Sequence, residues 1–193
     1  MPDEKSIEGV ILAAGTSFRA GTFKPALLIG GRPMLVRCVE GMVDVCGRII
    51  VVGGDGFEQI RRLVERLEKV ECLLNPAYRK GMFTSVKAGL AVARGERCFV
   101  LPGDIPLVPG RVYRQLLALD ADIVVPAFQG RNGHPICVSK SVIPRILRES
   151  DDSSLRHIVR TIGYRTVEVD AEEVLLDVDT PQDYETLRRR FAE

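Results

Sequence analysis

Short apolar runs alternate along the chain with segments in which apolar residues recur every three or four positions. The apolar runs are typical of buried strands, and the wider spacing is typical of helices with one buried face. Strands are predicted over residues 9–14, 48–52, 70–74, 98–101, 123–125, 136–138 and 166–169. Helices are predicted over residues 33–46, 57–68, 83–94, 141–148, 153–161 and 181–191, with a further helix that begins at Pro109.

This alternation predicts an α/β fold. Strands separated by helices form βαβ units, which build a mainly parallel sheet with helices on both faces. The 193 residues contain no internal repeat or linker, so we expect a single domain over residues 1–193. Ligands of such sheets bind beyond the carboxyl ends of the strands, so the residues that follow each strand carry the functional prediction.

The composition is that of an ordinary globular protein, with 46% apolar and 27% charged residues. A net charge of +1 gives no overall field for nucleic acid or an anionic membrane, so neither partner is expected. No apolar run approaches the ~20 residues of a membrane span. Residues 1–6 are polar and do not resemble a signal peptide, so we expect a cytoplasmic protein.

The cysteines favour the same compartment. They are odd in number, lack C-x-x-C spacing and lie in apolar segments, which predicts buried free thiols in a reducing cytoplasm. A zinc site or a catalytic thiol is the alternative. The residues are Cys38, Cys46, Cys72, Cys98 and Cys137.

The loop after the first strand combines small and cationic residues. Gly15, Arg19, Gly21 and Lys24 follow the strand within ten positions, but their spacing fits neither the P-loop nor the dinucleotide fingerprint. Small residues still let backbone N–H groups approach an anion, and the two cations add charge. We therefore predict a phosphate-binding loop, against the alternative of cations exposed by chance.

Carboxylates lie at two further positions that suit a metal ion. Asp104 follows the strand 98–101, where it is either a Mg²⁺ ligand or a helix N-cap. Asp177 and Asp179 fall in a segment that we predict as a strand, so they point to opposite faces and we expect only one of them to face the site. Thr180 and Asp183 fit a capping box for the last helix, which leaves Asp179 free for a metal.

Several ordered motifs resemble the MobA-like NTP transferase family, and most strongly its molybdenum cofactor cytidylyltransferase branch. They cover nearly the whole chain. The motifs are LAAGTSFRAGTFK at 12–24, GMFTSVKAGL at 81–90, PGDIP at 102–106, GRNGHP at 130–135, DDSSLRHIV at 151–159 and DVDTPQDY at 177–184.

The resemblance implies a three-layer Rossmann-like nucleotidyltransferase fold and assigns roles to particular residues. It implies that Arg19, Lys24 and the Gly15 backbone hold the triphosphate, and that Asp104 and Asp179 hold Mg²⁺. The catalytic set is then Arg19, Lys24 and Asp104. The implied nucleotide-binding and acceptor-binding residues are Leu12, Ala13, Ala14, Gly15, Arg19, Lys24, Ser85, His134 and Arg156.

Two of these assignments have simpler structural alternatives, and a third lies in a motif that departs from the family pattern. Ser85 is expected beside the base and ribose, although a serine near a helix start is often only a cap. His134 is expected by the acceptor, although it could instead hold its glycine-rich loop. Arg156 matches an acceptor-side arginine, but Ser154 stands where that family motif often carries glycine.

The expected reaction is Mg²⁺-dependent transfer of CMP from CTP to the phosphate of molybdopterin, with release of pyrophosphate. A molybdoenzyme is the implied partner for the product. Three alternatives remain within the class: guanylyl transfer from GTP, cytidylyl transfer to another phosphate such as a sugar-alcohol phosphate, and a sugar-nucleotide synthetase. A non-catalytic accessory protein that hands over a cofactor is the alternative from another class.

Overall fold

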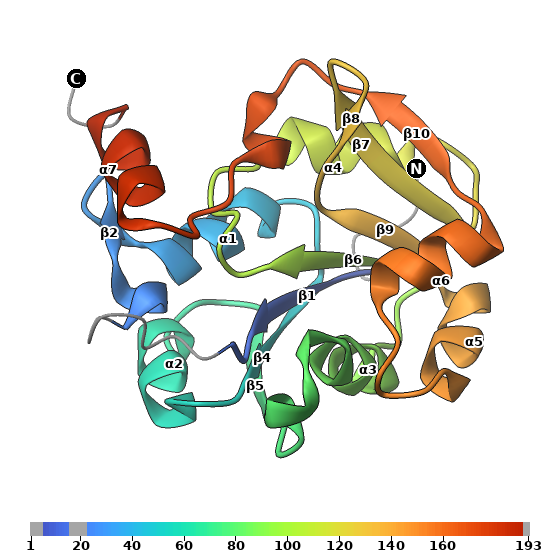
Figure 1. Cartoon of the computed structure of the whole chain (residues 1–193), viewed down its shortest axis with the longest axis horizontal. Helices are drawn as coiled ribbons and strands as arrows, with labels where there is room; N and C mark the ends of the chain where they lie inside the picture. Colours follow the sequence, from blue (N-terminus) through green and yellow to red (C-terminus); the bar gives the residue numbers. More distant parts are fainter. Residues whose placement is uncertain (1–5, 16–22, 191–193) are drawn as a thin grey trace.

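The computed structural model describes residues 6–15 and 23–190, and an eight-stranded sheet runs through them (Figure 1). The order of its strands is β10-β7-β9-β6-β1-β4-β5, with β8 paired to β7. The strands are β1 (Ile7–Ala13), β4 (Arg48–Gly53), β5 (Val70–Leu74), β6 (Arg97–Pro102), β7 (Ile123–Phe128), β8 (Arg131–Asn132), β9 (Ile136–Ser139) and β10 (Arg165–Glu168).

Helices connect these strands, and a small hairpin lies apart from the sheet. The hairpin pairs β2 (Leu28–Ile29) with β3 (Arg32–Pro33). In the described part of the chain, no helix is long and apolar enough to cross a membrane. The helices are α1 (Met34–Met42), α2 (Phe57–Val64), α3 (Met82–Val92), α4 (Gly110–Leu117), α5 (Ile143–Arg148), α6 (Leu155–Ile162) and α7 (Pro181–Arg189).

The sheet is mainly parallel, as the alternation of elements predicts. The central strand β1 runs parallel to both β4 and β6, and β5 and β10 continue this direction at the two edges. Within the described eight-stranded sheet, only β9 and the short β8 run opposite to the other strands. The carboxyl ends of β1, β4 and β6 therefore meet at one edge of the sheet, where a ligand is expected.

Both faces of the sheet are covered, which confirms the three-layer prediction. Side chains alternate along β1, so that Ile11 and Ala13 pack with α1, α2 and α4. Val10 and Leu12 point the other way and pack with α3, α5 and α6, which lie together at the lower right of Figure 1. A strand that is buried on both faces reads as a continuous apolar run, and this is why its pattern was clear in the sequence.

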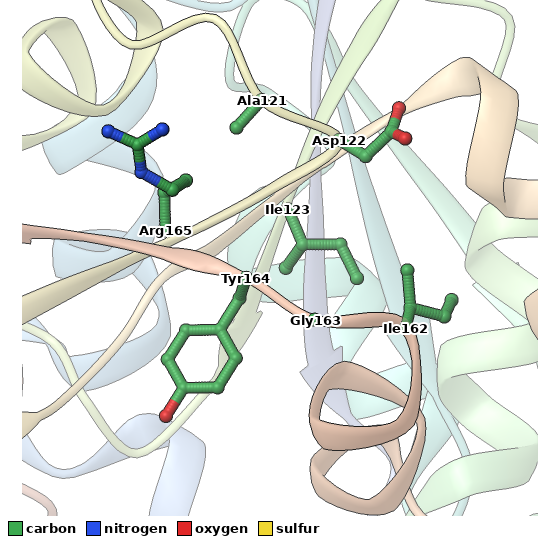
Figure 2. A pocket seen from close by; sticks show the side chains of 7 residues that line it. All are labelled: Ala121, Asp122, Ile123, Ile162, Gly163, Tyr164 and Arg165. Atoms are coloured by element: carbon green, nitrogen blue, oxygen red, sulfur yellow. The ribbon is translucent and has the colours of Figure 1, made fainter.

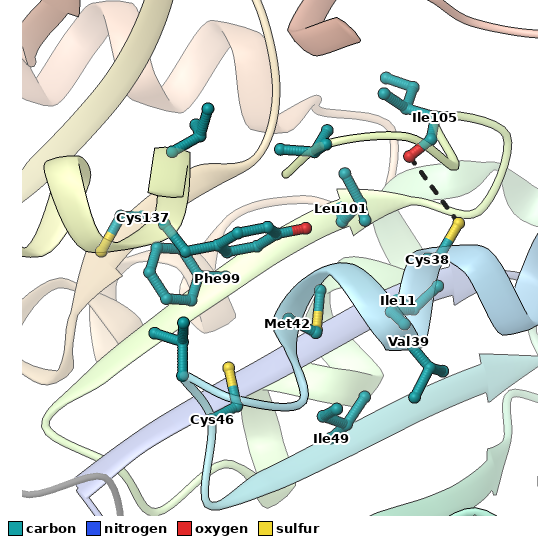
Figure 3. Packing of buried hydrophobic residues seen from close by; sticks show 14 of the residues in the cluster. Ile11, Cys38, Val39, Met42, Cys46, Ile49, Phe99, Leu101, Ile105 and Cys137 are labelled. Carbon is teal, nitrogen blue, oxygen red and sulfur yellow. Dashed lines mark hydrogen bonds between the residues drawn. The ribbon is translucent and has the colours of Figure 1, made fainter. Parts of the chain in front are cut away.

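The cysteines lie in this core as free thiols. Figure 3 shows Cys38 and Met42 on the inner side of α1, and Cys46 in the turn after it, near Ile49 of β4. Four of the five cysteines are buried, which confirms the expectation, while Cys72 on the edge strand β5 is half-buried.

One predicted strand is wrong. The segment that carries Asp177 and Asp179 follows a 3₁₀ helix (Glu172–Leu175) and has no strand partner. Its alternating pattern arises because Val178 alone is buried between two exposed aspartates, in irregular backbone. The helices also end earlier than predicted, since α1 stops at Met42 and α2 at Val64.

A buried tyrosine in the core gives a stability prediction. Tyr113 on α4 is fully buried and packs edge-on against Phe99, with 4.9 Å between ring centroids. Its hydroxyl has no hydrogen-bond partner among the described residues. Because an unpaired buried hydroxyl costs desolvation free energy, Tyr113→Phe should raise the free energy of unfolding by about 1 kcal/mol.

Urea unfolding measures this difference. The matched variant Tyr113→Ala, which removes the ring as well, should lose about 3–5 kcal/mol through the cavity it leaves. A clear loss of stability in Tyr113→Phe would mean that the hydroxyl has a partner in solution.

Candidate active site

A cleft of about 770 Å³ opens at the carboxyl ends of β1 and β6. It lies at the sheet edge where the strand directions predict a ligand site. The segments that line it come from the ends of β1 and β6, the start of α3, and the start of α7. Its lining residues are Leu12, Ala13, Ala14, Gly15, Lys24, Pro25, Leu27, Met34, Tyr78, Arg79, Gly81, Met82, Ser85, Pro102, Gly103, Asp104, Val178, Asp179, Thr180, Pro181 and Tyr184.

A second, smaller hollow of about 220 Å³ lies elsewhere (Figure 2). It sits at the amino ends of β7 and β10, which is the wrong end of a parallel sheet for a ligand site. Its one carboxylate, Asp122, accepts hydrogen bonds from the hydroxyls of Ser139 and Ser141. The cleft is therefore the candidate active site.

The floor of the cleft is formed by backbone segments that lie close together at the ends of β1 and β6. The Gly103 N–H donates to the carbonyl of Leu12 at 2.9 Å, which joins the ends of β6 and β1. Gly54, directly after β4, packs beside Tyr78, and a Cβ at Gly54 would lie 2.6 Å from the Tyr78 Cγ and 2.9 Å from the Ala14 carbonyl oxygen. Only glycine fits at this position.

Lys24 lies between two carboxylates at the cleft wall. Its Nζ is 3.0 Å from Asp104 Oδ2 and 3.2 Å from Asp179 Oδ1. The side chains of Lys24 and Asp104 are 28% and 27% exposed and that of Asp179 is 61% exposed, so these pairs add little to stability. Their importance is geometric, because both carboxylates reach a single cationic atom.

Backbone contacts bring these two carboxylates together from distant parts of the chain. The Val178 N–H donates to the Asp104 carbonyl at 3.0 Å, which ties the segment before α7 to the turn after β6. The neighbouring carbonyls, of Gly103 and Ile105, both accept from the Cys38 thiol, at 3.5 and 3.8 Å. Figure 3 shows the contact with Ile105 as a dashed line.

Asp179 lines the cleft and Asp177 does not. Partial desolvation of its carboxyl group raises the pKa of Asp177, although the residue as a whole is exposed, and the charges of Asp179 and Asp104 raise it further. Asp177 therefore lies close enough to both carboxylates for electrostatic repulsion, although it does not line the cleft.

The opposite wall is fixed by a buried amide. The Asn75 side-chain NH₂ donates to the hydroxyls of Thr84 and Ser85, each at 2.9 Å, and its oxygen accepts from the Ala77 N–H at 3.0 Å. Ser85 is buried on α3 and still borders the cleft. Its hydroxyl oxygen is thus held by Asn75 at the position where the sequence predicts nucleotide contact.

The sequence analysis missed part of the cleft lining. Tyr78, Met82 and Tyr184 border the cleft, and Met82 is 64% exposed. Arg79 borders it too, and its guanidinium lies 5.4 Å from the centroid of the Tyr78 ring. Each of these residues stands in or beside a quoted motif, so proximity to the motifs was the available signal.

The structure separates other predicted residues from the cleft. His134 does not line it, and neither does Arg156, which is exposed on α6. Ser154 caps that helix by accepting from the His157 N–H at 3.1 Å, which gives the serine a local structural role. Arg19 lies outside the described residues. Leu12, Ala13, Ala14 and Gly15 all border the cleft as the sequence suggests.

The donor set at the cleft fits a hard divalent cation. Mg²⁺ is usually bound through one or two carboxylates together with phosphate oxygens of a substrate, and Asp104 and Asp179 offer such a pair. No group of three or more His, Cys, Asp or Glu side chains within residues 6–15 and 23–190 could form a full protein cage. The arrangement suits an ion that is shared with a phosphate ligand.

The chain is similar to known proteins in sequence and in fold. The sequence matches the family model described as the MobA-like NTP transferase domain over residues 9–169. It is 30% identical to the molybdenum cofactor cytidylyltransferase of Escherichia coli (strain K12) over 189 residues, which covers 97% of this chain and 98% of that protein. It is 28% identical to a probable molybdenum cofactor guanylyltransferase of Carboxydothermus hydrogenoformans, with 94% and 95% covered.

A similar solved structure is that of Rv0371C from Mycobacterium tuberculosis H37Rv in complex with manganese. It superimposes with a TM-score of 0.79 at 25% identity, over 96% of this chain and 99% of that one.

The environment of His134 gives a pH prediction. Burial lowers the pKa of His134 from its ordinary value of 6.5, and the Asp104 carboxylate and the Val100 backbone offset only part of this effect. Below about pH 6.5 the unfolded chain therefore binds a proton that the folded protein does not. The contribution is fully present above pH 6.5 and is lost as the pH falls toward the lower folded pKa.

His134→Gln should flatten the fall of unfolding free energy between about pH 7 and 5, as measured by urea unfolding at a series of pH values. His157, which is exposed on α6, is the matched control, because His157→Gln makes the same substitution at the surface. An unchanged slope in His134→Gln would contradict the prediction.

Proposed function

The chain belongs to the family of MobA-like NTP transferase domains, and from this premise we propose that it transfers CMP from CTP to the phosphate of molybdopterin, releasing pyrophosphate. It is a nucleotidyltransferase, and its relatives in the molybdenum cofactor branch support the acceptor. The observation that carries the proposal is the convergence of Lys24, Asp104 and Asp179 at the end of β1 and β6.

The proposed reaction depends mainly on positive charge placed beside the reacting phosphates. The attacking phosphate of the acceptor is already an anion near neutral pH, so the reaction needs no general base. The obstacle is repulsion between two anions, which preorganised positive charge relieves. Lys24 projects such a charge into the cleft, and we propose that Arg19 adds a second.

We propose that Asp104 and Asp179 hold Mg²⁺. Two carboxylates that already converge on one ammonium support this assignment, and so does the manganese complex of the related Rv0371C. When bound, the ion supplies the charge that neutralises the triphosphate.

The chain's own residues then divide the work of binding. The backbone of Ala14 and Gly15 borders the cleft, and we assign it to the phosphates, because small residues let a ligand come close to the backbone. Ser85 borders the same cleft from α3, and we assign it to the base and ribose side. His134 and Arg156 lie outside the cleft lining, and we assign both to the acceptor side.

The choice of base has a second candidate. The guanylyltransferase relative is nearly as similar as the cytidylyltransferase, at 28% against 30% identity. The Ala13-Ala14 pair favours CTP, since it resembles the cytidylyltransferase form of the loop. The free thiols suit a reducing cytoplasm, where we place the enzyme and its molybdoenzyme partner.

The base choice is tested with purified protein, molybdopterin and Mg²⁺. Pyrophosphate release should be supported by CTP and be at least about 10-fold slower with GTP, a difference of about 1.4 kcal/mol in the transition state. Turnover with GTP in place of CTP would move the proposal to guanylyl transfer. No turnover with either nucleotide, with or without a sugar-alcohol phosphate, would favour a non-catalytic accessory role.

The role of Lys24 is tested by Lys24→Met, which keeps the length and the apolar stem of the side chain. We expect kcat to fall by about 100-fold or more, because a preorganised charge is lost. The melting temperature should change little, since the ion pairs are partly exposed. Arg32→Met, which removes an exposed pair with Glu40 outside the cleft, is the control and should keep wild-type kcat.

A further inference from the structure

Asp183 binds the backbone on which Asp179 stands. Its Oδ2 accepts from the Asp179 N–H at 3.1 Å, from the Thr180 N–H at 2.7 Å and from the Thr180 hydroxyl at 2.8 Å. The Thr180 hydroxyl oxygen in turn accepts from the Asp183 N–H at 3.2 Å. A single carboxylate oxygen thus gathers the donors of two consecutive residues.

This is more than the usual cap of a helix. In a capping box, the third helical residue reaches back to the N–H of the N-cap, which here is Thr180. Asp183 makes that bond and also reaches one residue further, to the N–H of Asp179. The extra bond lies outside the capping box and ties the backbone of a cleft residue to the helix.

Asp179 has few other restraints. Its side chain is 61% exposed, and Lys24 is the partner that the described residues give its carboxylate. On its amino side, the buried Val178 is anchored through its bond to the Asp104 carbonyl. On its carboxyl side, Asp183 is the anchor. The exposed carboxylate is therefore held in place through its backbone, from both directions.

Helix α7, which carries Asp183, is itself fixed to the body of the protein. Leu187 is buried in a small cluster with Ile29 and Met34, and the Tyr184 hydroxyl donates to the Leu28 carbonyl at 2.9 Å. Figure 1 shows α7 beside β2 on the left of the molecule. Because α7 is fixed, the Asp183 carboxylate can hold the backbone of Asp179 in a fixed position.

We propose that Asp183 is a positioning residue that holds the Asp179 carboxylate in place for a divalent cation shared with Asp104. This inference rests on the proposed function, in which Asp179 is a metal ligand. Residues that orient a metal ligand through hydrogen bonds commonly change metal affinity by about 10–100-fold when they are removed. The bonds from Thr180 lower the pKa of Asp183, so its oxygen remains an acceptor at neutral pH.

Two simpler accounts make different predictions. If Asp183 only caps the helix, its loss lowers stability and leaves metal affinity unchanged. If Asp183 only adds negative charge near the site, any neutral substitution weakens metal binding equally. If Asp183 positions Asp179, metal affinity depends on an oxygen at residue 183 that accepts the two N–H hydrogen bonds, and it does not depend on the negative charge of that residue.

The experiment titrates Mn²⁺ into the full chain and follows water-proton relaxation, which reports protein-bound Mn²⁺ directly. Asp183→Ala removes the acceptor, and we expect Mn²⁺ affinity to fall by about 10-fold or more. Asp183→Asn keeps an amide oxygen that can accept from both N–H groups but removes the charge, and we expect it to stay within about 3-fold of wild type. Melting temperatures are measured alongside.

Two matched controls come from the same chain. Ser154→Ala removes the side-chain cap of α6, so it should lower the melting temperature and leave Mn²⁺ affinity at the wild-type value. Asp177→Asn removes one negative charge near the two carboxylates without touching the capping bonds, so it measures the effect of charge alone.

The outcomes separate the inference from its premise. Wild-type affinity in Asp183→Ala, or equal losses in Asp183→Ala and Asp183→Asn, would overturn the positioning role. Asp179→Ala is the reference: if it binds Mn²⁺ as the wild type does, or if the wild type binds none, the proposed metal site itself fails. Loss in Asp179→Ala with no loss in Asp183→Ala rejects the positioning role and leaves the proposed function standing.

Discussion

The site depends on one contact between distant segments, the hydrogen bond from the Val178 N–H to the Asp104 carbonyl at 3.0 Å. Asp104 follows β6, and Asp179 lies 75 positions later in the chain, after the last strand, β10. No sheet ladder joins them. Because the backbone of one segment is pinned to the other, two carboxylates can meet the ammonium of Lys24 at the cleft wall.

The regular part of the fold supplies the rigid side of this arrangement. β1 and β6 are buried neighbours, and the Gly103 N–H bonds the end of one to the end of the other. The Cys38 thiol, on a helix packed into the core, contacts the carbonyls on either side of Asp104. The turn that carries Asp104 is thus held from the core, while Asp179 is held from α7. Each carboxylate has its own support, and this suits an ion that is shared between them.

Much of the fold followed from the sequence because parallel strands buried on both faces leave continuous apolar runs, as β1 and β4 do. The convergence of Lys24 and Asp104 was predictable for a related reason: residues that follow neighbouring parallel strands share one sheet edge. The segment around Asp177 was misread, since one buried residue between two exposed ones imitates a strand. Tyr78 and Met82 were missed because their place at the cleft follows from tertiary contacts, such as the packing of Tyr78 on Gly54. The residues Ser85 and Lys24 border the cleft as expected, and their roles stay predictions.

The charges of the cleft argue for a metal-coupled binding of nucleotide. Among the described residues that line it, the cations are Lys24 and Arg79 and the carboxylates are Asp104 and Asp179. These charges cancel, and Lys24 is directly engaged by both carboxylates, so the wall offers little net attraction to a triphosphate. A divalent cation held by Asp104 and Asp179 would reverse that balance and would leave Lys24 available to phosphates, because the ammonium and the ion compete for the same oxygens. The pairing of Lys24 with Asp104 and Asp179 therefore links metal binding to nucleotide binding, and each ligand should strengthen the binding of the other.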